Sequence, residues 1–79
     1  MKYAPLVEYC VKKLVDNDDM VEVEEVEDGN AIQVQIRVSP DDTGKVIGRS
    51  GRLISSLRQI VNIAAAKNEE TVYVKVLTE

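Results

Sequence analysis

Residues 39–58 read SPDDTGKVIGRSGRLISSLR, and this stretch decides the fold because Gly48 and Gly51 interrupt an otherwise helical pattern. Glycine lets the backbone turn sharply without a Cβ in the way. We therefore predict a helix that ends at Gly48 in a left-handed conformation, a tight turn, and a second helix that begins at Gly51. Such a turn brings backbone amides and a helix N-terminus to one spot, which favours an anion such as phosphate.

The helix before the turn has its own start signals. Pro40 suits the first helical position, Ser39 is a typical cap residue, and the acids Asp41 and Asp42 would face the positive end of the helix dipole. We expect this short helix to run from Pro40 to about Ile47. Capping also explains the adjacent carboxylates without a catalytic role.

Apolar periodicity predicts two longer helices. Apolar side chains recur at three- and four-residue steps from Tyr3 to Asp16 and again from Gly51 to about Lys67, so each segment presents one apolar stripe. Cys10, the only cysteine, lies on the first stripe. We interpret it as a small core residue rather than a reactive thiol.

Three segments alternate between apolar and polar residues as strands do. The clearest is residues 32–38, which follow a tight hairpin signal at Asp28-Gly29. Before the hairpin, Glu25-Val26 breaks the alternation of residues 21–26, which indicates a bulge or the end of pairing. The third strand is residues 72–77. The hairpin makes the first two strands antiparallel, and the two-helix crossover makes the last two parallel.

The predicted order is therefore α-β-β-α-α-β. It corresponds to the α+β class, with a three-stranded mixed sheet and three helices on one face. At 79 residues the chain fits one small domain, so we expect residues 1–79 to form a single domain.

Composition excludes several classes of function. The chain has no histidine and a single cysteine, so it can form neither an intramolecular disulfide nor a metal site of histidines and cysteines. The glycine turn also lacks the spacing of nucleotide-binding loops. We therefore expect no enzyme activity, no cofactor and no metal. No apolar run is long enough for a membrane span or a signal peptide, so we expect a cytoplasmic protein that does not contact a membrane.

Charge is distributed unevenly along the chain. The net charge is −4, but residues 1–42 hold 11 acids and 4 bases, whereas residues 43–68 hold 5 bases and no acid. Lys45, Arg49 and Arg52 lie on or beside the glycine turn, and we expect them to converge on it. A solvated helix face is the alternative interpretation, but the glycine turn at the centre of these charges favours an anion-binding surface.

The same residues carry a resemblance to a known family. Residues 46–54 resemble the apolar-Ile-Gly-x-x-Gly-x-x-Ile signature of KH domains, and the order of elements resembles the type II, prokaryotic form of that fold. A KH domain of this length, with Pro-Asp-Asp-x-Gly-Lys-Val-Ile-Gly before the loop, is similar to the KhpA family of small bacterial RNA-binding proteins. Arg49-Ser50 departs from the family's usual lysine followed by a longer polar residue, although the positive charge is kept.

The resemblance implies a mode of binding to single-stranded RNA. In KH domains the loop clamps the phosphate backbone while the bases lie in a mainly aliphatic groove. By motif position, Val46, Ile47 and Ile54 would support this groove, and the edge of the second strand would form its opposite wall. The complete set of candidate RNA-binding residues is Lys45, Val46, Ile47, Gly48, Arg49, Ser50, Gly51, Arg52, Ile54 and Arg58.

The resemblance also implies partners and a cellular role. Proteins that look like this one self-associate and pair with a larger KH-containing protein of the KhpB (Jag) type. They act as RNA chaperones and post-transcriptional regulators linked to cell-wall homeostasis and cell shape. The alternative function is a protein-interaction or dimerisation module with a vestigial loop, whose interface is Tyr73, Leu77 or an exposed helix face.

Overall fold

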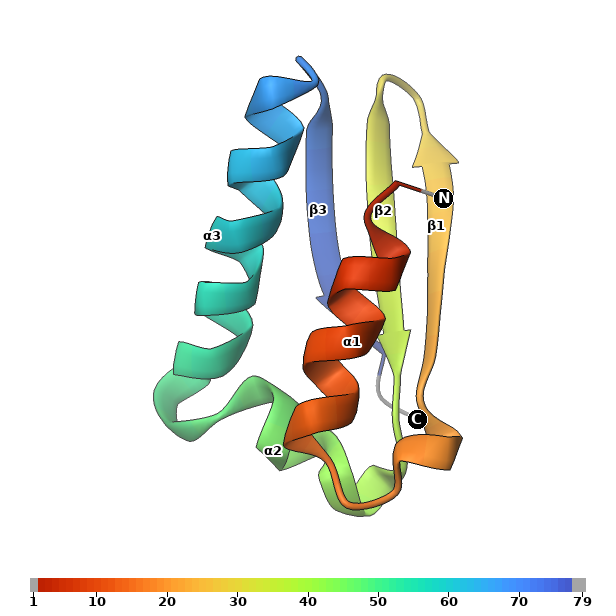
Figure 1. Ribbon diagram of the computed structural model, residues 1–79, viewed down its shortest axis with the longest axis vertical. Helices are drawn as coiled ribbons and strands as arrows, with labels where there is room; N and C mark the ends of the chain where they lie inside the picture. Colours follow the sequence, from red (N-terminus) through yellow and green to blue (C-terminus); the bar gives the residue numbers. More distant parts are fainter. Residues whose placement is uncertain (1, 78–79) are drawn as a thin grey trace.

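A three-stranded sheet carries three α-helices on one of its faces in the computed structural model, which describes residues 2–77 (Figure 1). The strands lie in the order β1-β2-β3, with β1 antiparallel and β3 parallel to the central β2. The predicted class, order of elements and strand directions are confirmed. The elements are α1 (Ala4–Leu14), β1 (Glu22–Asp28), β2 (Ala31–Arg37), α2 (Thr43–Ile47), α3 (Arg52–Lys67) and β3 (Thr71–Val76).

Strand β1 corrects the prediction of a bulge. Its pairing with β2 is continuous from Glu22 opposite Arg37 to Asp28 opposite Ala31. The alternation is broken because Glu25, a charged residue, points toward the helices. Its carboxylate accepts hydrogen bonds from the backbone N–H groups of Tyr3 and Ala4, both at 3.2 Å, and so satisfies amides at the start of α1.

The position of β2 corrects a second expectation. Because β2 pairs with a neighbour on each side, it has no free edge among the described residues. It therefore cannot form a wall of a groove with its edge. The strand edge on the side of the helix pair α2–α3 belongs to β3, against which α3 packs.

Branched aliphatic side chains fill the space between sheet and helices. The apolar stripes of α1 and α3 are wider than this core, because Leu6, Leu14, Leu53 and Ile60 remain exposed. None of the helices in the described part of the chain combines the length and apolar content that a membrane crossing requires. The largest fully buried apolar side chains of the core are Tyr3, Val7, Val11, Val34, Ile36, Val46 and Val61.

The core supports a prediction about stability from one matched pair of substitutions. Ile36, on the central strand of the sheet, is 0% exposed, whereas Ile63 on α3 is 74% exposed. We expect Ile36→Ala to lower the free energy of unfolding by about 2 to 5 kcal/mol, because it leaves a cavity. Ile63→Ala should change it by less than about 0.5 kcal/mol. Urea denaturation followed by circular dichroism measures both, and equal losses would contradict the placement of the core.

Candidate functional site

The turn between α2 and α3 requires glycine at position 48. Gly48 has φ 77° and ψ 172°, and a Cβ at this position would lie only 2.7 Å from Cγ of Leu53. Both the backbone conformation and the approach of the following helix therefore exclude a side chain. The turn is closed by hydrogen bonds from Gly48 N–H to the Gly44 carbonyl (2.8 Å) and from Gly51 N–H to the Gly48 carbonyl (3.1 Å).

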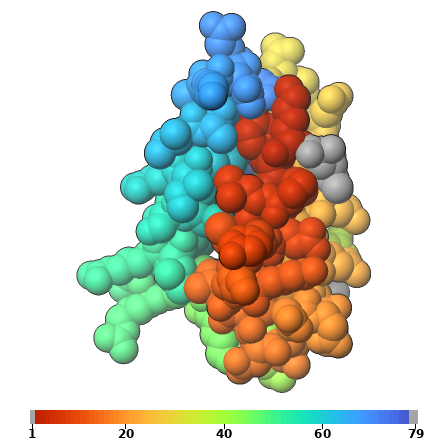
Figure 2. All heavy atoms as spheres, viewed as in Figure 1, coloured from red at the N-terminus to blue at the C-terminus, as the bar shows by residue number. Residues whose placement is uncertain are grey.

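The rest of the turn opens toward solvent at the start of α3. Ser50 and Gly51 also have positive φ, 57° and 73°, so the chain reverses within three residues. No side chain caps the N-terminus of α3, and Arg49 and Ser50 are exposed. The segment around residue 50 projects from the body of the molecule at the lower left of Figure 2. Backbone amides and the positive end of the helix dipole are thus accessible to an anion.

Two of the three predicted cations remain available beside the turn. Within residues 2–77, neither Arg49 nor Arg52 forms a salt bridge. Lys45 does: its ammonium contacts the Asp16 carboxylate and lies 3.6 Å from Oδ1 of Asp42. The predicted convergence of three cations is therefore wrong for Lys45. The acids that pair with it come from outside the acid-free segment.

Asp42 anchors the start of α2 rather than capping it. Its side chain is buried, and its carboxylate accepts hydrogen bonds from the Asn17 backbone N–H (3.0 Å), the Asn17 side-chain amide (2.9 Å) and the Asp16 backbone N–H (3.4 Å). Ser39 makes no capping hydrogen bond through its side chain. The capping interpretation of these two residues is wrong, because Asp42 instead joins the chain after α1 to the segment that leads into the glycine turn.

The environment of Asp42 favours its ionised form. Burial by itself raises the pKa of the Asp42 carboxyl, but the hydrogen bonds from Asn17 and Asp16 and the nearby Lys45 ammonium stabilise the carboxylate. Together these contacts hold the pKa of Asp42 below its ordinary value. The segment that leads into the turn is therefore anchored through a charged group.

The apolar candidates lie beneath the turn. Val46 and Ile54 are buried in the core, and Ile47 is half-buried and packs against it. These three side chains support the corner between α2 and α3 from inside. Arg58, four residues after Ile54 on α3, donates a hydrogen bond from Nε to the Val74 carbonyl of β3 (3.1 Å). This contact joins α3 to the edge strand.

A second surface lies between α1 and α3. From the sequence it was predicted only as an exposed helix face, with no residues named. It is a shallow apolar groove of about 320 Å³. The apolar stripes of α1 and α3 are wider than one core can bury, and this excess width is the feature of the sequence that indicates the groove. Cys10 is only half-buried there, beside the core rather than within it. The groove is lined by Tyr9, Cys10, Lys13, Leu14, Leu53, Ser56, Leu57 and Ile60.

Comparison with known proteins agrees with this geometry. A family model described as KhpA/KhpB, KH domain matches residues 4–76. The RNA-binding protein KhpA of Caldanaerobacter subterraneus subsp. tengcongensis is 42% identical over 72 residues, which cover 91% of this chain and 96% of that protein. The RNA-binding protein KhpA of Halalkalibacterium halodurans is also 42% identical, over 91% of this chain and 95% of its own length. That of Aquifex aeolicus is 39% identical over 91% of both chains.

The anchoring role of Asp42 predicts a stability difference that depends on pH. Because the pKa of Asp42 is lowered in the folded state, its ionisation favours folding above the unfolded-state pKa of about 3.9, and this advantage is lost as pH falls through the folded-state pKa. We expect Asp42→Asn to lower the urea midpoint at neutral pH, because the new amide group faces other donors. The difference from the unmodified chain should shrink below about pH 4.

The exposed neighbour Asp41 provides the control, since Asp41→Asn removes the same charge at an exposed position. Its urea midpoint should follow that of the unmodified chain at every pH. A loss for Asp42→Asn that is constant across pH would show that shape, and not the carboxylate charge, matters at this position.

Proposed function

This chain belongs to the KhpA/KhpB family of KH domains, and on that premise we propose that it binds single-stranded RNA through the turn from Gly48 to Gly51. The relatives named above carry the description RNA-binding protein. We further propose that residues 1–79 act as a single KH domain in the cytoplasm, as an RNA chaperone and post-transcriptional regulator rather than an enzyme. The link to cell-wall homeostasis and cell shape belongs to the same proposal.

The observation that carries the proposal is the exposed glycine turn at the uncapped start of α3. Gly48 lets α3 approach α2 closely, and the amides of the turn other than those of Gly48 and Gly51, with those of the first turn of α3, can donate to phosphate oxygens. Arg49 and Arg52 add positive charge on either side of this spot without a competing acid among the described residues. Guanidinium groups suit phosphate because they donate two parallel hydrogen bonds.

Bases would lie beside the turn, over the outer edge that α3 and the edge strand β3 form where they pack together. Arg58 joins the two elements at this edge through its hydrogen bond to the Val74 carbonyl, and Val46, Ile47 and Ile54 support the corner from below. A surface of this kind reads bases by hydrogen bonds and aliphatic contact, so it does not depend on aromatic stacking within the groove. The low aromatic content, 4% of the chain, is compatible with such a site.

The number of available cations limits the affinity of one domain. If Arg49, Arg52 and Arg58 neutralise two or three phosphates, log K should fall with log salt concentration with a slope of about −1.4 to −2.1. Binding by one domain should therefore be weak and sensitive to salt. Two linked domains would raise the apparent affinity for a longer RNA.

The central test reverses the charge at the turn. We expect the double variant Arg49→Asp, Ser50→Asp to lose binding of single-stranded RNA by more than about tenfold, because carboxylates then face the phosphates. Aspartate tolerates the positive φ of residue 50 better than most residues. Fluorescence anisotropy with a labelled RNA pool measures the affinity.

A charge-matched control separates this site from net charge. Ala66→Asp, Lys67→Asp changes the charge by the same amount at two exposed positions near the far end of α3. It should bind RNA nearly as well as the unmodified chain. Undiminished binding by the turn variant, or equal loss in both variants, would reject the proposed site.

The apolar groove between α1 and α3 favours a second component of the function, association with another KH domain. Four large apolar side chains that line this groove remain exposed, at positions 9, 14, 53 and 60. Such a concentration on one face of a small domain is typical of a protein interface. We propose that this face joins two copies of the chain, or one copy and a larger KH-containing protein of the KhpB type.

This interface leads to a prediction about oligomeric state. Ile60 lies on the wall of the groove and is partly exposed, so Ile60→Glu should place a charge in the interface and yield a monomer in sedimentation velocity runs. Val26→Glu, at a similarly exposed position on β1, should leave association unchanged. Association that survives Ile60→Glu would contradict the interface, and a monomeric unmodified chain would contradict its use between two copies.

A further inference from the structure

The face of the sheet that carries no helix has a row of polar and aromatic side chains along β2 and β3. Strand alternation places Gln33 and Gln35 on this face, and the pairing register sets them beside Tyr73 and Lys75 of β3. Figure 1 shows that α1 and α3 lie on the opposite side of the sheet. This row is therefore open to solvent, and the function proposed above does not use it.

Tyr73 is the most distinctive member of this row. It is 60% exposed, although it lies in the middle of a strand. Within residues 2–77, the side chains of Tyr73 and Lys75 form no hydrogen bond or ion pair with one another or with a neighbour. Gln35 donates to the side-chain oxygen of Gln33 (2.7 Å), which leaves amide donors of Gln33 and the oxygen of Gln35 able to bond to a ligand.

Charge on this face is divided between its two sides. The acids Glu22, Glu24 and Asp28 lie on β1, whereas Lys75 lies on β3 and Arg37 on β2. Since neighbouring strands are about 4.8 Å apart, the acidic row is about 10 Å from the row of β3. A polyanion would therefore be attracted to the side of β3 and repelled from that of β1.

The side of β3 is continuous with the proposed RNA site. Arg58 lies six residues after Arg52 on α3, about 9 Å along the helix axis. Its Nε binds the carbonyl of Val74, the residue between Tyr73 and Lys75. A strand that follows the cations from the glycine turn thus reaches the edge of β3 next to these two side chains.

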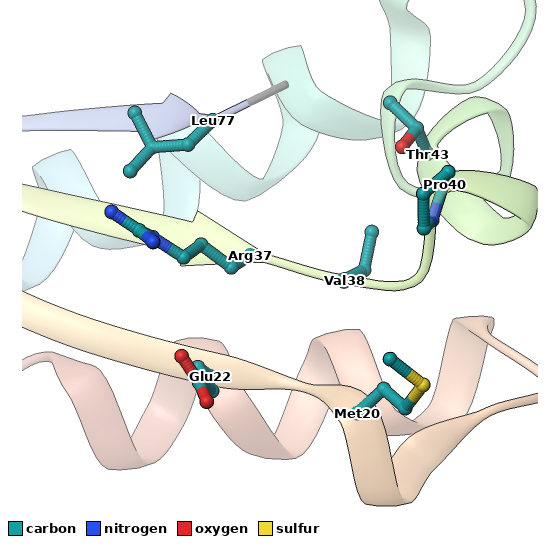
Figure 3. Close-up of a pocket in the computed structure, with 7 residues that line it drawn as sticks. All are labelled: Met20, Glu22, Arg37, Val38, Pro40, Thr43 and Leu77. Carbon is teal, nitrogen blue, oxygen red and sulfur yellow. The ribbon is translucent and has the colours of Figure 1, made fainter. Parts of the chain in front are cut away.

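A concave site lies at the end of this row that follows Lys75, next to Leu77. It has a volume of about 660 Å³ and lies where the face meets the start of α2. Figure 3 shows Arg37 and Leu77 on its sheet side, with Val38, Pro40 and Thr43 toward α2 and Met20 and Glu22 on the side of β1. The open row on β3 therefore runs from Tyr73 to a concave site beside the segment that carries the turn.

We propose that single-stranded RNA longer than the turn can hold passes round the edge of β3 and stacks a base on Tyr73, with a phosphate at Lys75. This inference rests on the proposed function and extends the site onto the helix-free face. Stacking on an exposed aromatic is tolerant of sequence and adds affinity for each base. The surroundings favour RNA over a protein partner, because lysine and glutamine surround Tyr73 and lysine is depleted in protein interfaces.

The test compares two lengths of RNA. Labelled random-sequence pools of about four nucleotides, the length that a KH loop clamps, and of about ten nucleotides are titrated by fluorescence anisotropy at low salt. Tyr73→Ala should weaken binding of the longer pool about fivefold or more and leave the shorter pool unchanged. Tyr73→Phe should retain binding of both pools, because the aromatic face remains.

Two matched controls accompany this variant. Val26, which is 41% exposed on the acidic β1 side of this face, provides Val26→Ala, and RNA affinity should not change. Lys75→Gln should reduce the salt slope for the longer pool by about 0.7, the value for one phosphate. Lys12→Gln, at a lysine that pairs with Glu8, should leave the slope unchanged.

The outcomes distinguish failure of this inference from failure of the proposed function. If Tyr73→Ala binds the longer pool as the unmodified chain does, while Arg49→Asp, Ser50→Asp abolishes binding, the inference is wrong and the function at the turn stands. If the unmodified chain binds neither pool, both are wrong. If Tyr73→Ala alters sedimentation but not RNA affinity, this face is a protein interface and the inference is overturned.

Discussion

At Gly48 two helices approach so closely that a side chain cannot fit between them, and the remaining features of the site depend on this approach. A Cβ would lie 2.7 Å from Leu53 in a backbone conformation that L-residues rarely adopt. The resulting corner ends α2, starts α3 without a side-chain cap, and exposes Arg49 at its tip. This one steric constraint therefore exposes both the backbone amides at the start of α3 and the Arg49 side chain, which a phosphate would meet together.

Several acidic residues of the chain have structural roles that the net charge does not reveal. Glu25 accepts hydrogen bonds from amides at the start of α1, and the buried Asp42 anchors the segment that leads to the turn. Asp16 pairs with Lys45, and Glu70 accepts a hydrogen bond of 2.6 Å from the buried Tyr3 hydroxyl. The Glu70 carboxylate raises the pKa of Tyr3, and the Tyr3 hydroxyl in turn lowers the pKa of Glu70. An acidic composition is thus compatible with a cationic surface, because several of the carboxylates form hydrogen bonds or ion pairs within the fold.

The molecule presents three surfaces with different chemistry. The turn and the adjoining α3 offer amides and guanidinium groups, the face between α1 and α3 is apolar, and the helix-free side of the sheet combines Tyr73 and Lys75 with an acidic border on β1. The helices α1 and α3, whose side chains line the apolar groove, lie on one side of the sheet and its open face lies on the other (Figure 1). The part of the proposed RNA path that crosses the sheet is therefore separate from the proposed interface.

Local patterns in the sequence determined the elements, their order and the glycine turn, because periodicity and the conformational freedom of glycine act over a few neighbouring residues. Tertiary structure decided what depends on residues far apart in the chain. The pairing of strands made β3, not β2, the edge strand, and packing brought Asn17 to Asp42 and Asp16 to Lys45 across more than 20 positions. Whether a carboxylate caps its own helix or anchors a distant loop depends on which donors the fold brings to it, and no local pattern contains that information.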